Sequence, residues 1–172
     1  CSMSEKIKII VCTHKKCDMP SESIYLPLHV GAAGKKNKDG SPLDFGYVRD
    51  DTGDNISIRN CNFGTQTGLY WAWKNLDADY KGLVHYRRYF VGKNYKKGNM
   101  PGSVITKNEI EPMLGKYKVF VPKKRRYYIE SLYSHYAHTH DETHFKIVES
   151  IISTDCPEYL TAFKRVMKRK WG

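Results

Sequence analysis

Two arginines and a histidine stand beside one another in the segment His85-Tyr86-Arg87-Arg88, directly after a short apolar run. Guanidinium groups offer fork-shaped donors that match phosphate oxygens. Cations at the end of a buried strand are costly unless an anion pairs with them. The segment therefore predicts that His85, Arg87 and Arg88 stabilise a departing diphosphate without an essential metal, with Tyr86 beside the substrate. The alternative is an Arg–carboxylate network that supports the loop at 50–57.

The stretch DDTGDNIS at residues 50–57 holds three carboxylates and two hydroxyls in eight positions. Such groups can bind a cation, hold sugar hydroxyls or supply a general base, although the closing Glu of a calcium loop is missing. We expect Asp51, Asp54 and Asn55 to contact ribose or sugar hydroxyls, and Asp54 is also the candidate base that deprotonates an acceptor. A solvated turn built on Gly53 is the alternative.

Two further clusters follow the first two predicted strands. Thr13-His14-Lys15 follows the first of them, and the turn Val30-Gly31-Ala32 follows the second. In open α/β sheets, ligands bind at the carboxyl ends of the strands. We therefore expect the first cluster to flank a nucleotide, while the small residues of the turn let the backbone approach its base or ribose.

Four histidines at positions 135, 138, 140 and 144 resemble a zinc cluster. His140 and His144 are spaced by four residues, but no Glu follows His140 as in the HExxH pattern, and a third ligand is not evident. A capped helix junction is the favoured interpretation, and no metal site is predicted. Five scattered cysteines without CxxC spacing argue against a disulfide framework or a cysteine-ligated zinc.

Charge and composition restrict the class of protein. The chain has 172 residues and a net charge of +11, which attracts phosphates of nucleotides, nucleic acids or lipid headgroups. Hydrophobic residues make up 40% and charged residues 27%, as in globular proteins. No apolar run approaches the roughly 20 residues that cross a bilayer, and no signal peptide is evident. We expect a cytoplasmic protein, and the basic stretch 123–126 leaves open a peripheral contact with the inner face of the membrane.

Hydrophobic periodicity indicates the elements that position these residues. Residues 1–5 are interpreted as a vector remnant and tail, and 6–172 as one domain whose chain ends before the sheet is complete. Strands alternating with helices predict an α/β fold with a single Rossmann-like domain and a mostly parallel sheet, in which Pro27 marks an edge strand or a bulge. We expect strands at 6–12, 24–30, 80–86 and 117–122, a long loop at 31–57, and helices at 63–76, 106–115, 127–138, 141–153 and 157–170.

Together these segments resemble a family of bacterial capsular and exopolysaccharide biosynthesis glycosyltransferases, first catalogued as a domain of unknown function. The resemblance covers the chain from Lys6 onward, and the order of its motifs is specific. The matching stretches are IIVCTHK at 9–15, LHVGAA at 28–33, DTGDNIS at 51–57, TGLYWAWKN at 67–75 and GLVHYRRYF at 82–90, with PEY at 157–159 fitting more loosely.

The resemblance implies a nucleotide-diphospho-sugar transferase fold of the GT-A type, in a family whose members continue beyond this chain. It also implies transfer of a hexose, galactose-like, from a UDP-sugar to a glycan or lipid-linked acceptor, with no nucleic acid as partner. The alternative is a non-enzymatic basic module that binds nucleic acid or an anionic membrane surface. Against nucleic acid, no RNP, KH or zinc-finger pattern occurs, and the carboxylates of 50–57 would repel a phosphate backbone.

Overall fold

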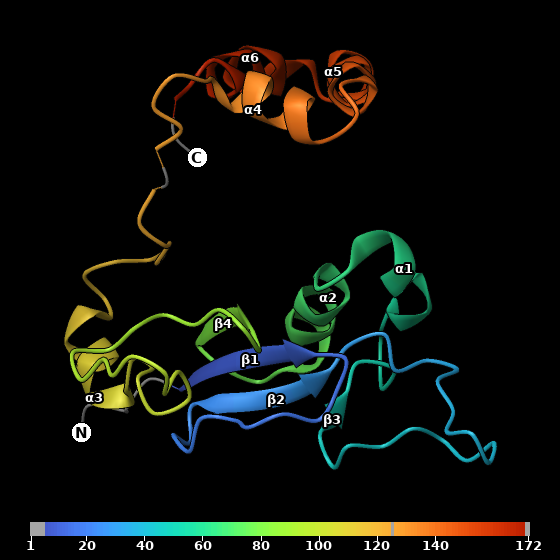
Figure 1. Ribbon diagram of the computed structural model, residues 1–172, viewed down its shortest axis with the longest axis vertical. Helices are drawn as coiled ribbons and strands as arrows, with labels where there is room; N and C mark the ends of the chain where they lie inside the picture. Colours follow the sequence, from blue (N-terminus) through green and yellow to red (C-terminus); the bar gives the residue numbers. More distant parts are fainter. Residues whose placement is uncertain (1–5, 125, 171–172) are drawn as a thin grey trace. The chain divides into compact units, whose positions relative to one another are not determined.

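The computed structural model describes residues 6–124 and 126–170. The chain divides into two compact units, Cys1–Val119 and Phe120–Gly172, where the sequence predicted a single domain over 6–172 (Figure 1). The predicted tail at 1–5 lies outside the described residues. The first unit holds the sheet, and the second is helical.

The first unit is built on a four-stranded parallel sheet with the order β3-β2-β1-β4. The central strand β1 pairs over Ile7–Cys12 with β4 and over Ile9–Thr13 with β2. This confirms the predicted α/β fold with a mostly parallel sheet. The elements of this unit are β1 (Ile7–Thr13), β2 (Tyr25–His29), β3 (Val48–Arg49), α1 (Asn60–Phe63), α2 (Gln66–Asn75), β4 (Tyr80–His85) and α3 (Lys107–Ile110).

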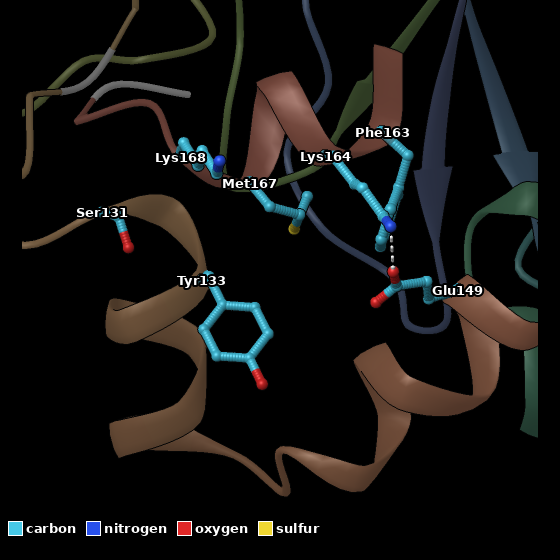
Figure 2. A pocket seen from close by; sticks show the side chains of 7 residues that line it. All are labelled: Ser131, Tyr133, Glu149, Phe163, Lys164, Met167 and Lys168. Carbon is cyan, nitrogen blue, oxygen red and sulfur yellow. Dashed lines mark ion pairs between the residues drawn. The ribbon is translucent and has the colours of Figure 1, made fainter. Parts of the chain in front are cut away.

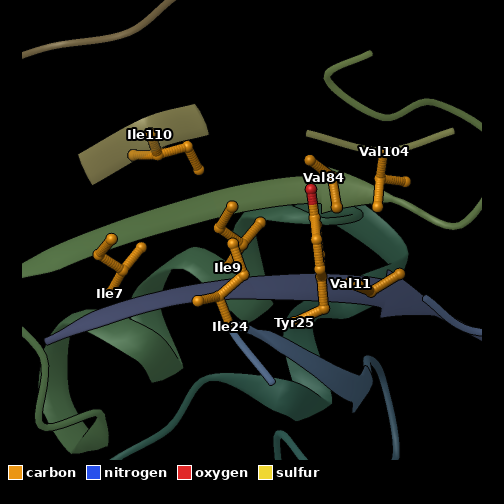
Figure 3. Close-up of a cluster of buried hydrophobic side chains, with 8 residues drawn as sticks. All are labelled: Ile7, Ile9, Val11, Ile24, Tyr25, Val84, Val104 and Ile110. Carbon is orange, nitrogen blue, oxygen red and sulfur yellow. The ribbon is translucent and has the colours of Figure 1, made fainter. Parts of the chain in front are cut away.

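Both faces of the sheet are covered. Alternate residues of a strand point to opposite sides, so the apolar strands present side chains to both faces, and other segments pack against each. Ile10 and Cys12 of β1 pack with Trp71 and Ala72 of α2 on one face. The opposite face carries the second cluster, which the segment after β4 closes from above (Figure 3). That cluster consists of Ile7, Ile9, Val11, Ile24, Tyr25, Val84, Val104 and Ile110.

Helix α2 lies very close to the sheet because Gly68 faces it. A Cβ added to Gly68 would lie 2.8 Å from the Cys12 Sγ and 2.9 Å from a Val30 methyl carbon. Such distances are shorter than any normal van der Waals contact, so a larger residue would push the helix away from the strands. Glycine therefore sets the spacing between this helix and the sheet.

Two predicted features of the sheet differ from the structure. The loop expected at 31–57 contains β3, which pairs with β2 through Leu28 and His29. Pro27 precedes this pairing, so at Pro27 β2 has β1 on one side and no strand of the described residues on the other. Proline has no backbone N–H, and on the unpaired side this costs no hydrogen bond between strands. The strand expected at 117–122 does not form, because no strand of the described residues lies beside it to share hydrogen bonds.

The described residues of the second unit form three α-helices, which pack around an aromatic cluster, and a 3-10 helix at Pro157–Tyr159. Between ring centroids, Phe145 lies 4.3 Å from Tyr136 and 6.5 Å from Phe163. No described residue of this unit is fully buried, and no helix among the described residues is long and apolar enough to cross a bilayer. The helices are α4 (Leu132–Thr139), α5 (Thr143–Asp155) and α6 (Leu160–Met167).

The histidines of the second unit are engaged by neighbouring side chains. His135 and His138 each approach a carboxylate oxygen of Glu130 through Nδ1, at 3.1 and 2.6 Å. The Tyr136 hydroxyl lies 3.0 Å from His144 Nδ1, and the Tyr136 ring stacks on His140 at 4.6 Å. Among the described residues, no group of three or more His, Cys, Asp or Glu side chains could hold a metal ion.

A buried histidine makes the stability of the first unit depend on pH. His29 is 2% exposed, packs against the tilted Phe45 ring at 4.4 Å between ring centroids, and its Nδ1 has no partner among the described residues. Burial, and then the Arg49 cation, lower the pKa of His29. Below about pH 6.5, His29 therefore becomes protonated in the unfolded chain but stays neutral in the folded chain. The free energy of unfolding consequently falls as the pH falls.

We predict that His29→Phe flattens this dependence between pH 7 and pH 5, measured by urea unfolding at each pH. The aromatic ring keeps the packing against Phe45 but cannot be protonated. A residual slope of the same sign is expected from His85, whose pKa is also lowered. An unchanged slope in the variant would show that His29 does not titrate as described.

Candidate functional site

Tyr86 is the centre of a cluster of cationic and aromatic side chains where β1 and β4 end. Its backbone N–H donates to the Cys12 carbonyl at 3.1 Å, which continues the pairing of the two strands. Around its ring lie His14 at 5.5 Å and His85 at 4.4 Å between ring centroids. Lys15 Nζ lies 5.2 Å and Arg87 Cζ 5.3 Å from the ring centroid, so cation–π attraction helps to hold both cations here. The structure thus brings together residues that the sequence placed in two separate clusters.

Arg87 and Arg88 present their guanidinium groups to solvent. Both residues are exposed, and neither forms an ion pair with a carboxylate of the described residues. Arg88 is fixed through its backbone, which donates to the His85 carbonyl at 2.7 Å. Among the described residues, neither arginine contacts a carboxylate of 50–57, so these two side chains do not form the Arg–carboxylate network that was the predicted alternative. The two guanidinium groups therefore remain available to an anion.

His85 carries a neutral imidazole near neutral pH. Burial lowers the pKa of His85, and the nearby Arg87, His14 and Arg88 lower it further. The Arg87 backbone N–H points at the His85 Nδ1 at 3.4 Å, a long contact that favours the tautomer with its proton on Nε2. In this state His85 can donate one hydrogen bond from Nε2 without adding charge to the site.

Thr13 shapes the loop that carries His14 and Lys15. Thr13 is fully buried, and its hydroxyl donates to the Lys15 carbonyl at 2.7 Å. The Thr13 hydroxyl oxygen in turn accepts a hydrogen bond from the Lys15 N–H at 3.2 Å. The Thr13 hydroxyl oxygen also lies 3.7 Å from the Cys17 Sγ. Thr13 was predicted to flank the nucleotide, and the structure uses its side chain to form the turn beneath that position.

The turn Val30-Gly31-Ala32 is bound by a buried carboxylate. The N–H groups of Gly31 and Ala32 donate to the two oxygens of Asp50 at 2.9 and 3.1 Å. Gly31 has a φ of +66°, and a Cβ there would lie 2.6 Å from the Asn60 side chain. Position 31 thus requires glycine because of its positive φ and the nearby Asn60 side chain. From the sequence, the glycine was expected to let the backbone approach a base or ribose.

Asp50 joins three segments at the carboxyl edge of the sheet. Besides the two backbone amides, it accepts hydrogen bonds from the hydroxyls of Ser57 at 2.5 Å and Thr67 at 2.7 Å. Asp50 is fully buried, so its charge is balanced by these four donors and not by water. From the sequence, Asp50 was only one of several carboxylates in the acidic stretch, and no role was predicted for it. The signal was its position directly after β3, which the sequence did not reveal.

The other acidic residues of 50–57 are engaged within the protein. Arg49 holds Asp51 through two hydrogen bonds of 3.0 and 2.7 Å, and also donates to the carbonyls of Leu43 and Ala32. The Asn55 side chain donates to the Gly53 carbonyl at 2.9 Å and completes a turn within its own loop. The predicted contacts of Asp51 and Asn55 with sugar hydroxyls would compete with these bonds.

Asp54 is attached to the last turn of α2 and not to the edge where Asp50 lies. Its backbone exchanges two hydrogen bonds with the Asn75 side chain, at 3.1 and 2.8 Å, and its carboxylate accepts from Tyr70 at 3.1 Å. Asn75 follows Thr67, the partner of Asp50, by eight residues, or about 12 Å along a helix. It lies at the end from which the chain enters β4. The structure therefore gives the predicted base a role in fastening loop and helix.

The donor set at this edge does not fit a resident divalent metal, which GT-A glycosyltransferases commonly hold with an Asp-x-Asp pair. Both oxygens of Asp50 are taken by four donors, and those of Asp51 by Arg49. No group of three or more ligating side chains occurs in the described part of the chain. Lys15, Arg87 and Arg88 at this edge form no ion pair with the described residues.

The sequence matches the family model of a domain of unknown function, DUF4422, over residues 8–172. The chain belongs to the DUF4422 family. The apo structure of the bifunctional glycosyltransferase WbbM is similar to this DUF4422 chain, with a TM-score of 0.76 and 28% sequence identity. The likeness covers 97% of the present chain and 32% of WbbM, so the DUF4422 chain spans about a third of that protein. No curated protein sequence matches the present chain. The fold of the present chain is that of a GT-A-like α/β domain.

Proposed function

We propose that this DUF4422 chain is a glycosyltransferase domain that uses a UDP-sugar as donor and holds the diphosphate with protein cations. The observation that carries the proposal is the pair of exposed arginines beside Tyr86, which lack a carboxylate partner among the described residues and follow β4 at the carboxyl edge of a parallel sheet. That edge is where open α/β sheets bind their ligands. The likeness to a glycosyltransferase supports the same class of reaction.

In the proposed complex, Arg87 and Arg88 bind oxygens of the diphosphate, with Lys15 also beside the Tyr86 ring. When the bond between the sugar and the diphosphate breaks, negative charge grows on the leaving oxygen. Cations already in place stabilise this charge without rearranging, and a single such donor typically contributes about 3 kcal/mol to the transition state. The proposal contains no step that requires a metal.

Neutral His85 complements the two arginines in this proposal. A third full positive charge beside Arg87 and Arg88 would repel both of them, and the lowered pKa of His85 avoids this. Its Nε2–H can donate to a phosphate or sugar oxygen. Tyr86 presents a ring against which a base or a sugar can lie. We propose a galactose-like hexose as the transferred group and a glycan or lipid-linked acceptor in polysaccharide synthesis.

Thermal unfolding with nucleotide sugars tests this function. A UDP-sugar at about a hundred times its Kd should raise the free energy of unfolding by roughly 2.7 kcal/mol, and thus Tm by about 5 °C. We expect UDP-galactose to produce this shift and to produce it equally in EDTA and in manganese, because the arginines supply the positive charge. Free UDP should give a smaller shift of the same sign.

Two results would contradict the proposal. A shift that appears only with manganese would show that a metal, and not the arginines, holds the diphosphate. Binding of a generic oligonucleotide at moderate salt, with no response to any UDP-sugar, would favour a basic binding module instead. The salt dependence of oligonucleotide binding, measured in parallel by fluorescence anisotropy, separates this outcome from simple inactivity.

A further inference from the structure

The helices of the second unit enclose a groove of about 450 Å³ (Figure 2). Sites for small organic ligands typically have volumes of roughly 300–1,000 Å³, so the groove is large enough for one such molecule. Its apolar part is formed by Tyr133, Phe163 and Met167, and its polar part includes Lys164 and Lys168. None of these residues belongs to the cluster around Tyr86, so the groove is a separate feature of the chain.

The apolar part of the groove is fixed by aromatic packing. The Tyr133 ring stacks on Phe145 at 5.4 Å, and Phe145 in turn contacts Phe163 at 6.5 Å. The Tyr133 hydroxyl donates to a Glu142 carboxylate, which sets the direction of the ring. Figure 2 shows Tyr133 of α4 and Met167 of α6 pointing into the same space. A thioether beside two rings is a surface that adapts to an aliphatic chain.

The polar part of the groove carries an excess of positive charge. Glu149 forms an ion pair with Lys164 at 3.1 Å, whereas Lys168 is exposed and makes no ion pair with the described residues. Ser131 lines the groove on the same side as Lys168 in Figure 2, and its hydroxyl hydrogen has no acceptor in the described ranges. The end of the chain that contributes Lys168 is strongly basic, with Lys164, Arg165, Lys168, Arg169 and Lys170 in close succession.

We propose that this groove binds a single-chain lipid with a phosphate head. The aliphatic chain covers Tyr133, Phe163 and Met167, and the phosphate accepts hydrogen bonds from Lys168 and Ser131. Charge complementarity selects an anionic head, because a neutral lipid would leave Lys168 without a counter-charge. The apolar surface selects a chain, because free phosphate would leave the rings and the thioether in water.

Calorimetric titration of the 172-residue protein with three probes below their micelle concentrations tests this site. The probes are dodecyl phosphate, dodecyl maltoside and inorganic phosphate. We expect dodecyl phosphate to bind at least tenfold more tightly than either of the others. Lys168→Glu and Met167→Gln should each weaken its binding by about tenfold, since a charge-assisted hydrogen bond or a buried aliphatic contact is lost.

The matched control is Arg165→Glu, which makes the same charge change on α6 at a residue that does not line the groove. Its binding should stay within about twofold of the parent protein, because the Arg165 side chain does not line the groove and salt screens its exposed charge. Helical content by circular dichroism verifies that each variant is folded, and Lys168→Gln replaces Lys168→Glu if the reversal unfolds the helices. Equal binding of inorganic phosphate, equal binding of dodecyl maltoside, or an equal loss in Arg165→Glu would each overturn the proposal.

Discussion

Replacing Arg87 by alanine is expected to lower the turnover of a UDP-sugar by about a hundredfold or more, the usual effect of removing one donor that stabilises a developing negative charge. Arg87 is exposed and its guanidinium contacts the Tyr86 ring, so the fold should survive the change. Turnover is measured by release of UDP, and unfolding by urea verifies unchanged stability. Arg87→Lys should recover only part of the activity, because an ammonium group lacks the planar fork that matches two phosphate oxygens.

Lys81 provides the control for this experiment. It is an exposed cation of the same strand, β4, where its Nζ donates to the Trp73 carbonyl at 3.4 Å near the amino end. Lys81→Ala removes the same net charge and should leave turnover within about twofold, because the carboxyl edge is unaffected. Normal turnover in Arg87→Ala, or an equal loss in Lys81→Ala, would exclude the role in holding the diphosphate.

Replacing Asp50 by asparagine is expected to destabilise the first unit by about 3 kcal/mol or more. The introduced amide would present an N–H donor where the carboxylate of Asp50 now receives four donors, so buried N–H and hydroxyl groups would lose their acceptor. Asp50→Ala should cost still more, because no oxygen remains. The midpoint of urea unfolding, with the slope checked for two-state behaviour, gives the change directly.

Asp54→Asn is the matched substitution in the same acidic stretch. Asp54 is exposed, and its ion pair with Lys74 is long, at 3.8 Å, so the change should cost less than about 1 kcal/mol. The same variant examines the predicted catalytic base. Turnover close to that of the parent would agree with a structural role at the end of α2, whereas a hundredfold loss with unchanged stability would restore Asp54 as the base.

Hydrophobic patterns located the long strands but could not locate the short one. The runs that became β1 and β4 are apolar over most of their length, which is a strong local signal. Strand β3 has two residues and no pattern to detect, and only its pairing with β2 defines it. The converse occurred at 117–122, where the pattern favours a strand but Val119 and Val121 are 75% and 72% exposed. Strand formation needs a neighbour, and sequence alone does not show one.

The candidate site was predictable to the extent that its residues are neighbours in the chain. His85, Arg87 and Arg88 come from one segment, so their proximity needed no knowledge of the fold. Which carboxylate of 50–57 turns inward depends on where β3 ends, and this selects Asp50 over Asp51 or Asp54. Three of the four donors to Asp50 come from residues 17 to 19 positions away, a separation at which local patterns carry no information.

The contact of α2 with the sheet through Gly68 limits how this unit can respond to a ligand. A helix seated at glycine distance has no room to slide or tilt without colliding with Cys12 and Val30. Accommodation of different donors should then come from the exposed side chains of Lys15, Arg87 and Arg88, while the framework stays rigid. Attempts to broaden donor choice by mutagenesis would accordingly gain more from varying these exposed positions than from loosening the helix beneath them.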